Sequence, residues 1–267
     1  MTRRLRPATA WIVFGALCLW AGGCGDRKEK EPRSARGLES LPSLDSLSLE
    51  TPRSEGLQPL PDAPLRSLEQ LLALPRTPEV ELDLGTVYLR ADNLDSAIVH
   101  YRRGAEGMPG DPAGWNYLGI ALARAGRYEE ANEAYDRALQ ADAYRLETHI
   151  NLGNLHFRRE NWDAAIREYR IAATIDSTDA KMWLNLGLAY DRAENTDQAG
   201  RAYRKAALAA PLDPLPWELL GNLYYRKELY AGAADAWEEA AARDLSRQDL
   251  VEHSRKLREW QESLANP

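Results

Sequence analysis

The sequence predicts an all-α protein in which five units of 34 residues, each a helix–turn–helix, stack into a solenoid. Three series of residues that recur at this spacing support the prediction. They are a glycine series (Gly85, Gly119, Gly153, Gly187, Gly221), an alanine series (Ala97, Ala131, Ala165, Ala199, Ala233) and an aromatic series (Tyr101, Tyr135, Tyr169, Tyr203, Trp237). The shared register places the units at residues 78–111, 112–145, 146–179, 180–213 and 214–247.

Within each unit, the spacing of apolar residues predicts two amphipathic helices. In the fourth unit, Trp183, Leu186 and Tyr190 lie three and four residues apart and form one stripe of the first helix. Ala199 and Tyr203 form the corresponding stripe of the second helix. We expect the recurring glycines to mark points where two helix backbones approach closely, while aromatic side chains fill the wider gaps.

The motif Trp-x2-Leu-Gly-x2-Tyr, followed by Ala-x3-aromatic, resembles the tetratricopeptide repeat family across residues 78–247. The resemblance implies a right-handed superhelical solenoid whose concave groove is lined by the first helix of each unit. It also implies that a protein or peptide partner binds in that groove.

The N-terminal segment resembles a bacterial lipoprotein signal. Arginines precede an apolar run at residues 8–20 that is short for a bilayer span, and three small residues lie directly before Cys24. The resemblance implies a signal peptide at residues 1–23, acylation of Cys24 and a lipid-anchored protein of the bacterial cell envelope. Gly25 favours the periplasmic face of the outer membrane, if the cell has one. An ordinary secretory signal and an uncleaved anchor are the alternatives.

Residues 24–64 are expected to form a disordered linker, because they are rich in proline and serine and lack aromatic residues. Leucines recur within its serine-rich part (Leu38, Leu41, Leu44, Leu47, Leu49). Two interpretations remain open, a docking motif for a partner and a slightly apolar tether.

Capping helices are predicted at both ends of the solenoid, because terminal units need a polar outer face. Residues 65–77 predict a short helix, half of a degenerate unit, that ends at Pro75. Residues 248–267 predict a second capping helix with four apolar residues on one face (Leu250, Leu257, Trp260, Leu264).

Composition argues against two kinds of partner. The 41 acidic residues outnumber the 34 basic ones, for a formal net charge of −7. An acidic chain is a poor partner for nucleic acid, whose phosphates require a basic face. It also gains nothing from anionic lipid headgroups, so we expect the acyl chains alone to provide membrane attachment.

The sequence contains no pattern typical of a catalytic or metal centre, so we expect no enzyme, cofactor or metal. His149 and His156 replace the Trp and Tyr of the other units, and we expect them to pack between helices. His100 and His253 are expected to stand alone on exposed faces.

A series of asparagines is the first candidate for a binding site. In the family that the chain resembles, residues near the glycine of the first helix point into the groove. A primary amide both donates and accepts hydrogen bonds, which suits the backbone of an extended peptide. We therefore expect these side chains to face solvent and bind a client, with polar surface of no function as the alternative. The candidates are Asn116, Asn151, Asn154, Asn185 and Asn222.

Arginines form a second candidate series, one in every unit near the end of the first helix: Arg90, Arg124, Arg158, Arg192 and Arg226. One interpretation is that each arginine complements the helix dipole and bonds the last carbonyls. The other is a row of guanidinium groups that bind the carboxylates of a client along one edge of the groove.

One subtype of the family clamps the C-terminal carboxylate of chaperones with Lys, Asn and Arg. Asn154 and Asn185 match the asparagines of that subtype. Ile150, Leu215 and Leu219 stand where its cations would be, which disfavours the subtype.

These observations favour an envelope lipoprotein whose solenoid is a scaffold for protein–protein interactions. A pilotin-like assembly factor for a type IV pilus or secretion system is an alternative, which the long linker disfavours. A self-associating element without a client is another, and the oligomeric state stays open. An enzyme subunit associated with peptidoglycan is the least favoured class.

Overall fold

A computed structural model describes residues 67–265, which form twelve α-helices and no strand. The helices are α1 (Leu68–Leu72), α2 (Pro78–Arg90), α3 (Leu94–Gly107), α4 (Pro112–Arg124), α5 (Tyr128–Ala141), α6 (Leu146–Arg158), α7 (Trp162–Ile175), α8 (Ala180–Arg192), α9 (Thr196–Ala209), α10 (Leu215–Arg226), α11 (Tyr230–Arg243) and α12 (Gln248–Ala265).

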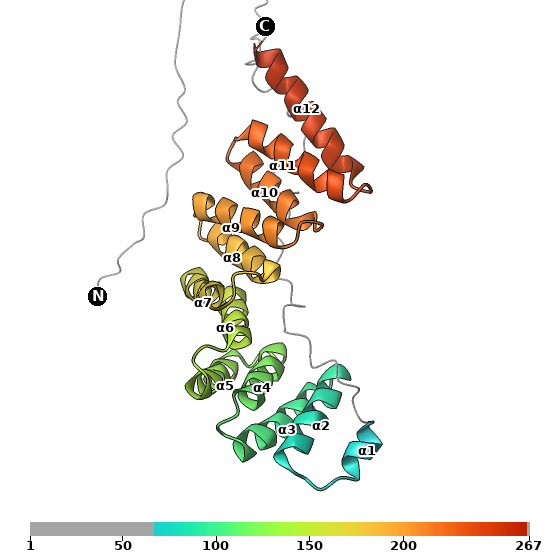
Figure 1. Cartoon of the computed structure of the whole chain (residues 1–267), viewed down its shortest axis with the longest axis vertical. Coiled ribbons are helices and arrows are strands. Elements are labelled where there is room, and N and C mark those ends of the chain that lie inside the picture. The colour runs from blue at the N-terminus through green and yellow to red at the C-terminus, as the bar shows by residue number, and fades with distance from the viewer. Residues whose placement is uncertain (1–66, 266–267) are drawn as a thin grey trace, which may run out of the picture. The chain divides into compact units, whose positions relative to one another are not determined.

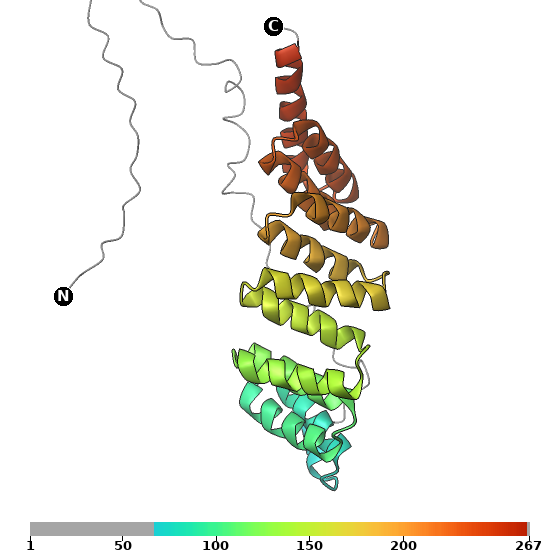
Figure 2. The same cartoon turned by 90° about the vertical axis from the view of Figure 1, so that its left-hand side faces the viewer.

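Helices α2 to α11 pack as consecutive hairpins (Figure 1). We number them the first pair (α2–α3), second pair (α4–α5), third pair (α6–α7), fourth pair (α8–α9) and fifth pair (α10–α11). The second helix of each pair also packs on the first helix of the next pair, so the hairpins stack in chain order (Figure 2). This arrangement confirms the prediction of an all-α solenoid.

The glycine and aromatic series meet inside each pair. A Cβ atom added to Gly153 would lie 2.5 Å from the ring of Tyr169, and each of the other four glycines faces its own aromatic ring at 2.4–2.5 Å. The five aromatic side chains are at most 1% exposed. No larger residue fits at these glycines without displacing a buried ring, as expected. The neighbour is the aromatic side chain of the second helix and not its backbone, so the rings pack directly on the glycines.

Every first helix ends in a left-handed residue at the same place in the register. These residues are Asp92, Gly126, Glu160, Glu194 and Glu228, with φ between 56° and 76°. The next amide donates a hydrogen bond back to the helix, as from Asn195 N to Tyr190 O at 2.8 Å. This closure satisfies a free carbonyl and reverses the chain sharply. Four of the five positions carry a side chain where glycine is favoured.

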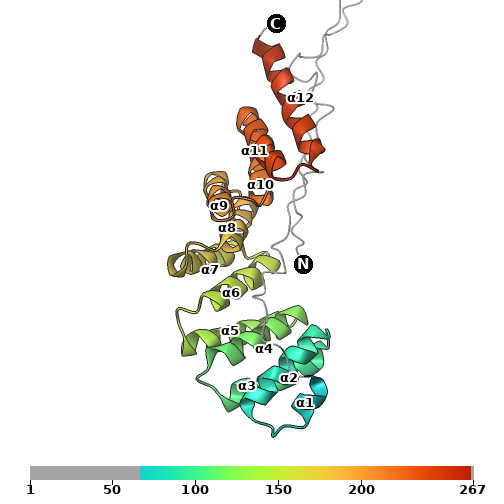
Figure 3. The ribbon, with the colours of Figure 1, turned by 45° about the vertical axis from the view of Figure 1, so that its right-hand side comes forward.

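Single helices, α1 and α12, cover the two ends of the stack (Figure 3). Leu71 of α1 is fully buried against Val80 and Leu84 of α2. On α12, Leu250 and Leu257 are buried. Leu264 is 44% exposed, so the expectation that it packs with them is wrong. It lies in the last turn of α12, which has 18 residues against 14 in α11 and therefore outruns its partner.

The signal peptide, Cys24 and the leucines of the linker lie outside the described residues. The predictions made for them stay predictions. Between residues 67 and 265, no helix has both the length and the apolar character needed to cross a bilayer.

Candidate functional site

The asparagine series is buried, which contradicts the expectation that these side chains face solvent. Asn116 and Asn151 are 1% exposed, Asn185 is 2% exposed, and even Asn154 reaches only 9%. Asn222 is buried as well. The first helices of neighbouring pairs stack closely enough to cover the amides. The spacing between these helices cannot be deduced from one unit considered alone.

The buried amides bond to their neighbours. Asn116 Oδ1 accepts hydrogen bonds from Thr148 Oγ1 at 3.2 Å and from Asn151 Nδ2 at 3.1 Å. These contacts join α4 to α6. Buried amide oxygens need such donors, so the network stabilises the junction between the second and third pairs.

The same arrangement recurs one junction further along. Asn154 Oδ1 accepts from Tyr169 OH at 2.6 Å and from Asn185 Nδ2 at 3.0 Å, which joins α6 to α8. In the fifth pair, Asn222 Oδ1 accepts from Trp237 Nε1 at 2.9 Å. The asparagine series thus holds helices together. Its role in client binding stays a prediction, which the burial of these side chains does not support.

The arginine series lies in the last turn of each first helix, as expected. Arg124 Nη2 donates to Asp92 at 2.7 Å, and Arg226 Nη2 donates to Asp191 at 2.5 Å. Both carboxylates belong to the preceding pair of the same chain. These two arginines therefore bridge neighbouring pairs, and binding a client carboxylate would require them to exchange partners.

Two histidines pair with glutamates inside the helix pairs. His149 shares a hydrogen bond of 2.8 Å with Glu168, and His100 shares one of 2.6 Å with Glu81. His149 is buried, as expected. His100 does not stand alone on an exposed face, because it is half-buried and stacks on Tyr88 at 5.1 Å between ring centroids.

His253 is also half-buried, with its ring 5.9 Å from that of Trp237. The expectation that it stands alone on an exposed face is wrong. Burial lowers the pKa of His253 and that of His156. In the part of the chain that the structure describes, no three His, Cys, Asp or Glu residues gather as metal ligands would.

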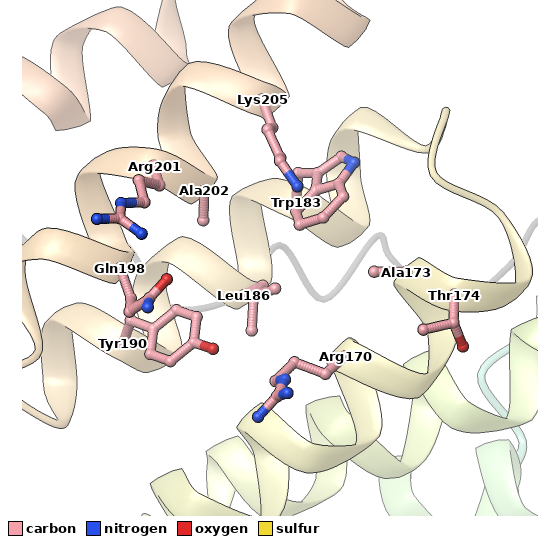
Figure 4. Close-up of a pocket in the computed structure, with 10 residues that line it drawn as sticks. All are labelled: Arg170, Ala173, Thr174, Trp183, Leu186, Tyr190, Gln198, Arg201, Ala202 and Lys205. Carbon is pink, nitrogen blue, oxygen red and sulfur yellow. The ribbon is translucent and has the colours of Figure 1, made fainter.

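A pocket opens between α7, α8 and α9, on the side of α8 that faces the second helices (Figure 4). Trp183, Leu186 and Ala202 form its buried floor, and its volume is about 560 Å³. Asn185 and Arg192 lie on the opposite side of α8, because successive helical residues are rotated by about 100°. The pocket is thus distinct from the groove that the first helices were expected to form.

Three cations surround this floor: Arg170 from α7 and Arg201 and Lys205 from α9. Lys205 Nζ lies 4.0 Å from the centre of the Trp183 ring, a cation–π contact that fixes both side chains. The indole is also held by a hydrogen bond of 2.8 Å from its Nε1 to Ser177 O. No acidic residue lines the pocket. We call it the fourth-pair pocket.

A second pocket occupies the same position two units earlier. It lies between α3, α4 and α5, with Trp115, Leu118 and Ala134 as its floor and a volume of about 330 Å³. Its charged residues are Arg102, Glu106, Glu130, Glu133 and Arg137. We call it the second-pair pocket.

In the third pair, the corresponding positions hold a different pair of side chains. His149 stands where Trp183 and Trp115 stand, and Glu168 stands where Ala202 and Ala134 stand. The Glu168 carboxylate is the main cause of the raised pKa of His149. The third pair therefore provides its own carboxylate at a position where the fourth pair has only a methyl group.

Sequence reasoning missed both pockets, although the signal was present. The register of 34 aligns Glu133 with Arg201 and Glu130 with Gln198. A comparison of these exposed positions between units would have found the change in charge. The change in charge lies on the second helices, whereas the predicted binding residues all lie on the first helices.

The fold and the surface define a helical-repeat scaffold, a class of protein that binds other proteins through extended helical surfaces. The chain belongs to the tetratricopeptide repeat family. A family model described as "Tetratricopeptide repeat" matches residues 66–145 and 184–249, and one described as "TPR repeat" matches residues 153–192. The chain is accordingly a scaffold for protein–protein interactions.

Among known proteins, the peroxisomal targeting signal receptor of Kluyveromyces lactis is 43% identical over 68 residues, which are 25% of this chain and 12% of the receptor. The chain thus spans about an eighth of this relative. The solved chain of MamA 41-end from Desulfovibrio magneticus RS-1 superposes with a TM-score of 0.60 at 22% identity over 66% of this chain and 99% of the solved chain. YrrB, titled a TPR protein with an unusual peptide-binding site, has a TM-score of 0.56 at 17% identity over 66% of this chain and 91% of YrrB. The last two similarities show the fold alone.

Proposed function

We propose that this chain is a membrane-anchored scaffold of the bacterial cell envelope that binds segments of client proteins. The fourth-pair pocket is the observation that carries client binding, because it combines a buried apolar floor with charged groups around an open mouth. Such a mixture of apolar area and a few polar groups is typical of binding sites. The name of the yeast relative, a receptor for a targeting signal, supports a client of the same broad kind.

Membrane anchoring rests on Cys24 and the small residues before it. Because one acyl chain gives only marginal membrane binding, a stable anchor requires more than one. Cys24→Ser should give a soluble or unprocessed protein that takes up no labelled fatty acid. Unchanged labelling of that variant would remove the lipid anchor from the proposal while leaving client binding intact.

Client binding is tested by photo-crosslinking in cells. A benzophenone amino acid is placed at Gln198 beside the fourth-pair pocket, at Glu130 beside the second-pair pocket and at Arg158, which is exposed near the end of α6. We expect a discrete adduct with another protein from at least one position. Adducts only with a second copy of this chain would favour self-association, and no adduct from any position would contradict the scaffold.

A further inference from the structure

We infer that the fourth-pair pocket binds an acidic segment of the client, with an apolar side chain on its floor and a carboxylate among its three cations. The inference rests on the proposed function and names the chemistry of the partner. The asparagine and arginine series of the first helices have no part in it.

The charge of the pocket differs from that of the chain. Acidic residues outnumber basic ones 41 to 34 over the whole sequence, yet the lining contains Arg170, Arg201 and Lys205 and no acid. Three cations in one opening repel one another unless an anion joins them. The composition therefore points to a bound negative charge.

The three cations are available to such a charge. Within residues 67–265, none of them forms an ion pair with a carboxylate of the protein. Arginine binds a carboxylate through two parallel hydrogen bonds, which gives orientation as well as energy. Lys205 is already held over Trp183, so little further ordering is needed when a ligand binds.

The third pair shows what fits at this place. There Glu168 occupies the position of Ala202 and hydrogen-bonds to His149, which occupies the position of Trp183. The protein thus supplies an internal carboxylate at the corresponding position. In the fourth pair the alanine leaves that volume open, and the cations around it remain without an acid.

The second-pair pocket shows that the pocket alone is not enough. Its Trp115 also lies under a cation, with Arg137 Cζ 4.7 Å from the ring centre. However, Arg102 already donates to Glu130 at 3.2 Å, and Glu106 and Glu133 add two further negative charges. An acidic segment would be repelled there, so it should distinguish two pockets that share the same floor residues.

An acidic protein segment fits this pocket better than a lipid surface or a nucleic acid. A long polyanion would approach a chain whose net charge is −7, and of the two pockets described above only the fourth-pair pocket would attract it. The apolar lining contributes nothing to phosphate binding, whereas a leucine or aromatic residue beside the carboxylate would pack on the partly exposed ring of Tyr190 and on the remaining exposed edge of Trp183.

The test uses the full chain with Cys24→Ser and a fluorescein-labelled peptide, GSELDELGS, followed by fluorescence anisotropy. We expect saturable binding that weakens as salt rises, because partly exposed ion pairs are screened. The neutral peptide GSQLNQLGS should bind at least tenfold more weakly. Arg170→Glu with Lys205→Glu should reduce affinity for the acidic peptide at least tenfold, while the matched pair Arg102→Glu with Arg137→Glu in the second-pair pocket should change it less than twofold.

Four outcomes overturn the inference. They are equal binding of the two peptides, equal effects of the two sets of variants, tighter binding to vesicles of phosphatidylglycerol than to the peptide, and competition by the chain itself. Competition would appear as tighter peptide binding after Glu39→Gln, Asp45→Asn and Glu50→Gln, since residues 38–50 contain acids and leucines. If crosslinked clients appear from Glu130 or Arg158 but none from Gln198, the proposed scaffold function is supported and binding at the fourth-pair pocket is contradicted.

Discussion

The second and fourth helix pairs carry the same tryptophan, leucine and alanine in their pockets and opposite charges around them. Trp115 and Trp183 each pack under a cation. Around Trp115, glutamates outnumber arginines three to two, whereas around Trp183 there are three cations and no acid. The difference shows that two pairs with the same floor residues can carry different charges at the exposed positions around that floor. Specificity for a client can therefore change without loss of the fold.

Replacing the tryptophan in either pocket should lower the free energy of unfolding by the same amount, but the two replacements should differ in their effect on peptide affinity. Trp183→Ala and Trp115→Ala each remove a large side chain that is at most 9% exposed, so we expect each to destabilise the fold by about 3 kcal/mol. Chemical denaturation measures this loss. Only Trp183→Ala should abolish binding of the acidic peptide, and equal loss of binding in both variants would show that the fourth-pair pocket has no special role.

The third helix pair, which lies between these two in the chain, predicts that the stability of the fold depends on pH. The Glu168 carboxylate raises the pKa of His149 above its usual value near 6.5, so the folded state binds the proton more tightly than the unfolded state. The resulting stabilisation is complete below the unfolded pKa and is lost as pH rises through the folded one. Denaturation from pH 5.5 to 8.5 should show this loss relative to Glu168→Gln, which removes the partner.

His156 and His253 have lowered pKa values and act in the opposite direction, so the comparison with Glu168→Gln is essential. Parallel stability curves for the two proteins would mean that the imidazole of His149 gains nothing from its glutamate.

A glutamate at the position of Glu168 should have different effects on stability in the second and fourth pairs. Ala202→Glu places a carboxylate among three cations, whereas Ala134→Glu adds a fourth acid to the second-pair pocket. We expect the first variant to be more stable than the second by about 1 kcal/mol. The glutamine variants at both positions control for size. Ala202→Glu should also block the acidic peptide, and a variant that binds it normally would argue against the proposed position of the carboxylate.

The smallest expected effect lies at the left-handed residue that ends each first helix. The second pair has Gly126 there and the fourth pair has Glu194, at φ values of 76° and 58°. Glu194→Gly should relieve strain and stabilise by about 0.5 kcal/mol, while Gly126→Ala should destabilise by about 1 kcal/mol. Melting temperatures that move the same way in both variants would contradict the backbone explanation.

The fold could be predicted because its signals are local. A glycine facing an aromatic ring needs only the geometry of one helix pair, and the spacing of 34 reports it five times. The asparagines were misplaced because their burial depends on how closely α4, α6 and α8 stack, which is a property of neighbouring pairs. Donors such as Thr148 and Tyr169 lie 32 and 15 residues from the amides that they satisfy.

The pockets escaped prediction for a related reason. Their floor residues belong to the repeat motif and do not by themselves indicate a binding site. The proposed function depends on exposed charged residues, which the motif does not specify. Glu133 and Arg201 occupy one register position, and no periodic signal distinguishes a surface charge that binds a client from one that only keeps the protein soluble.

The transposed pairs Glu81–His100 and His149–Glu168 have a consequence for how such a chain changes over generations. The first pair has its acid on the first helix, and the third pair has its acid on the second. Exchanging Glu and His one at a time would give an intermediate with two acids or two imidazoles in contact, where like groups repel. A tryptophan and an alanine occupy the same two positions in the second and fourth pairs, so an uncharged pair is also compatible with the fold. The charged pair can therefore be lost and regained in either orientation through an uncharged intermediate.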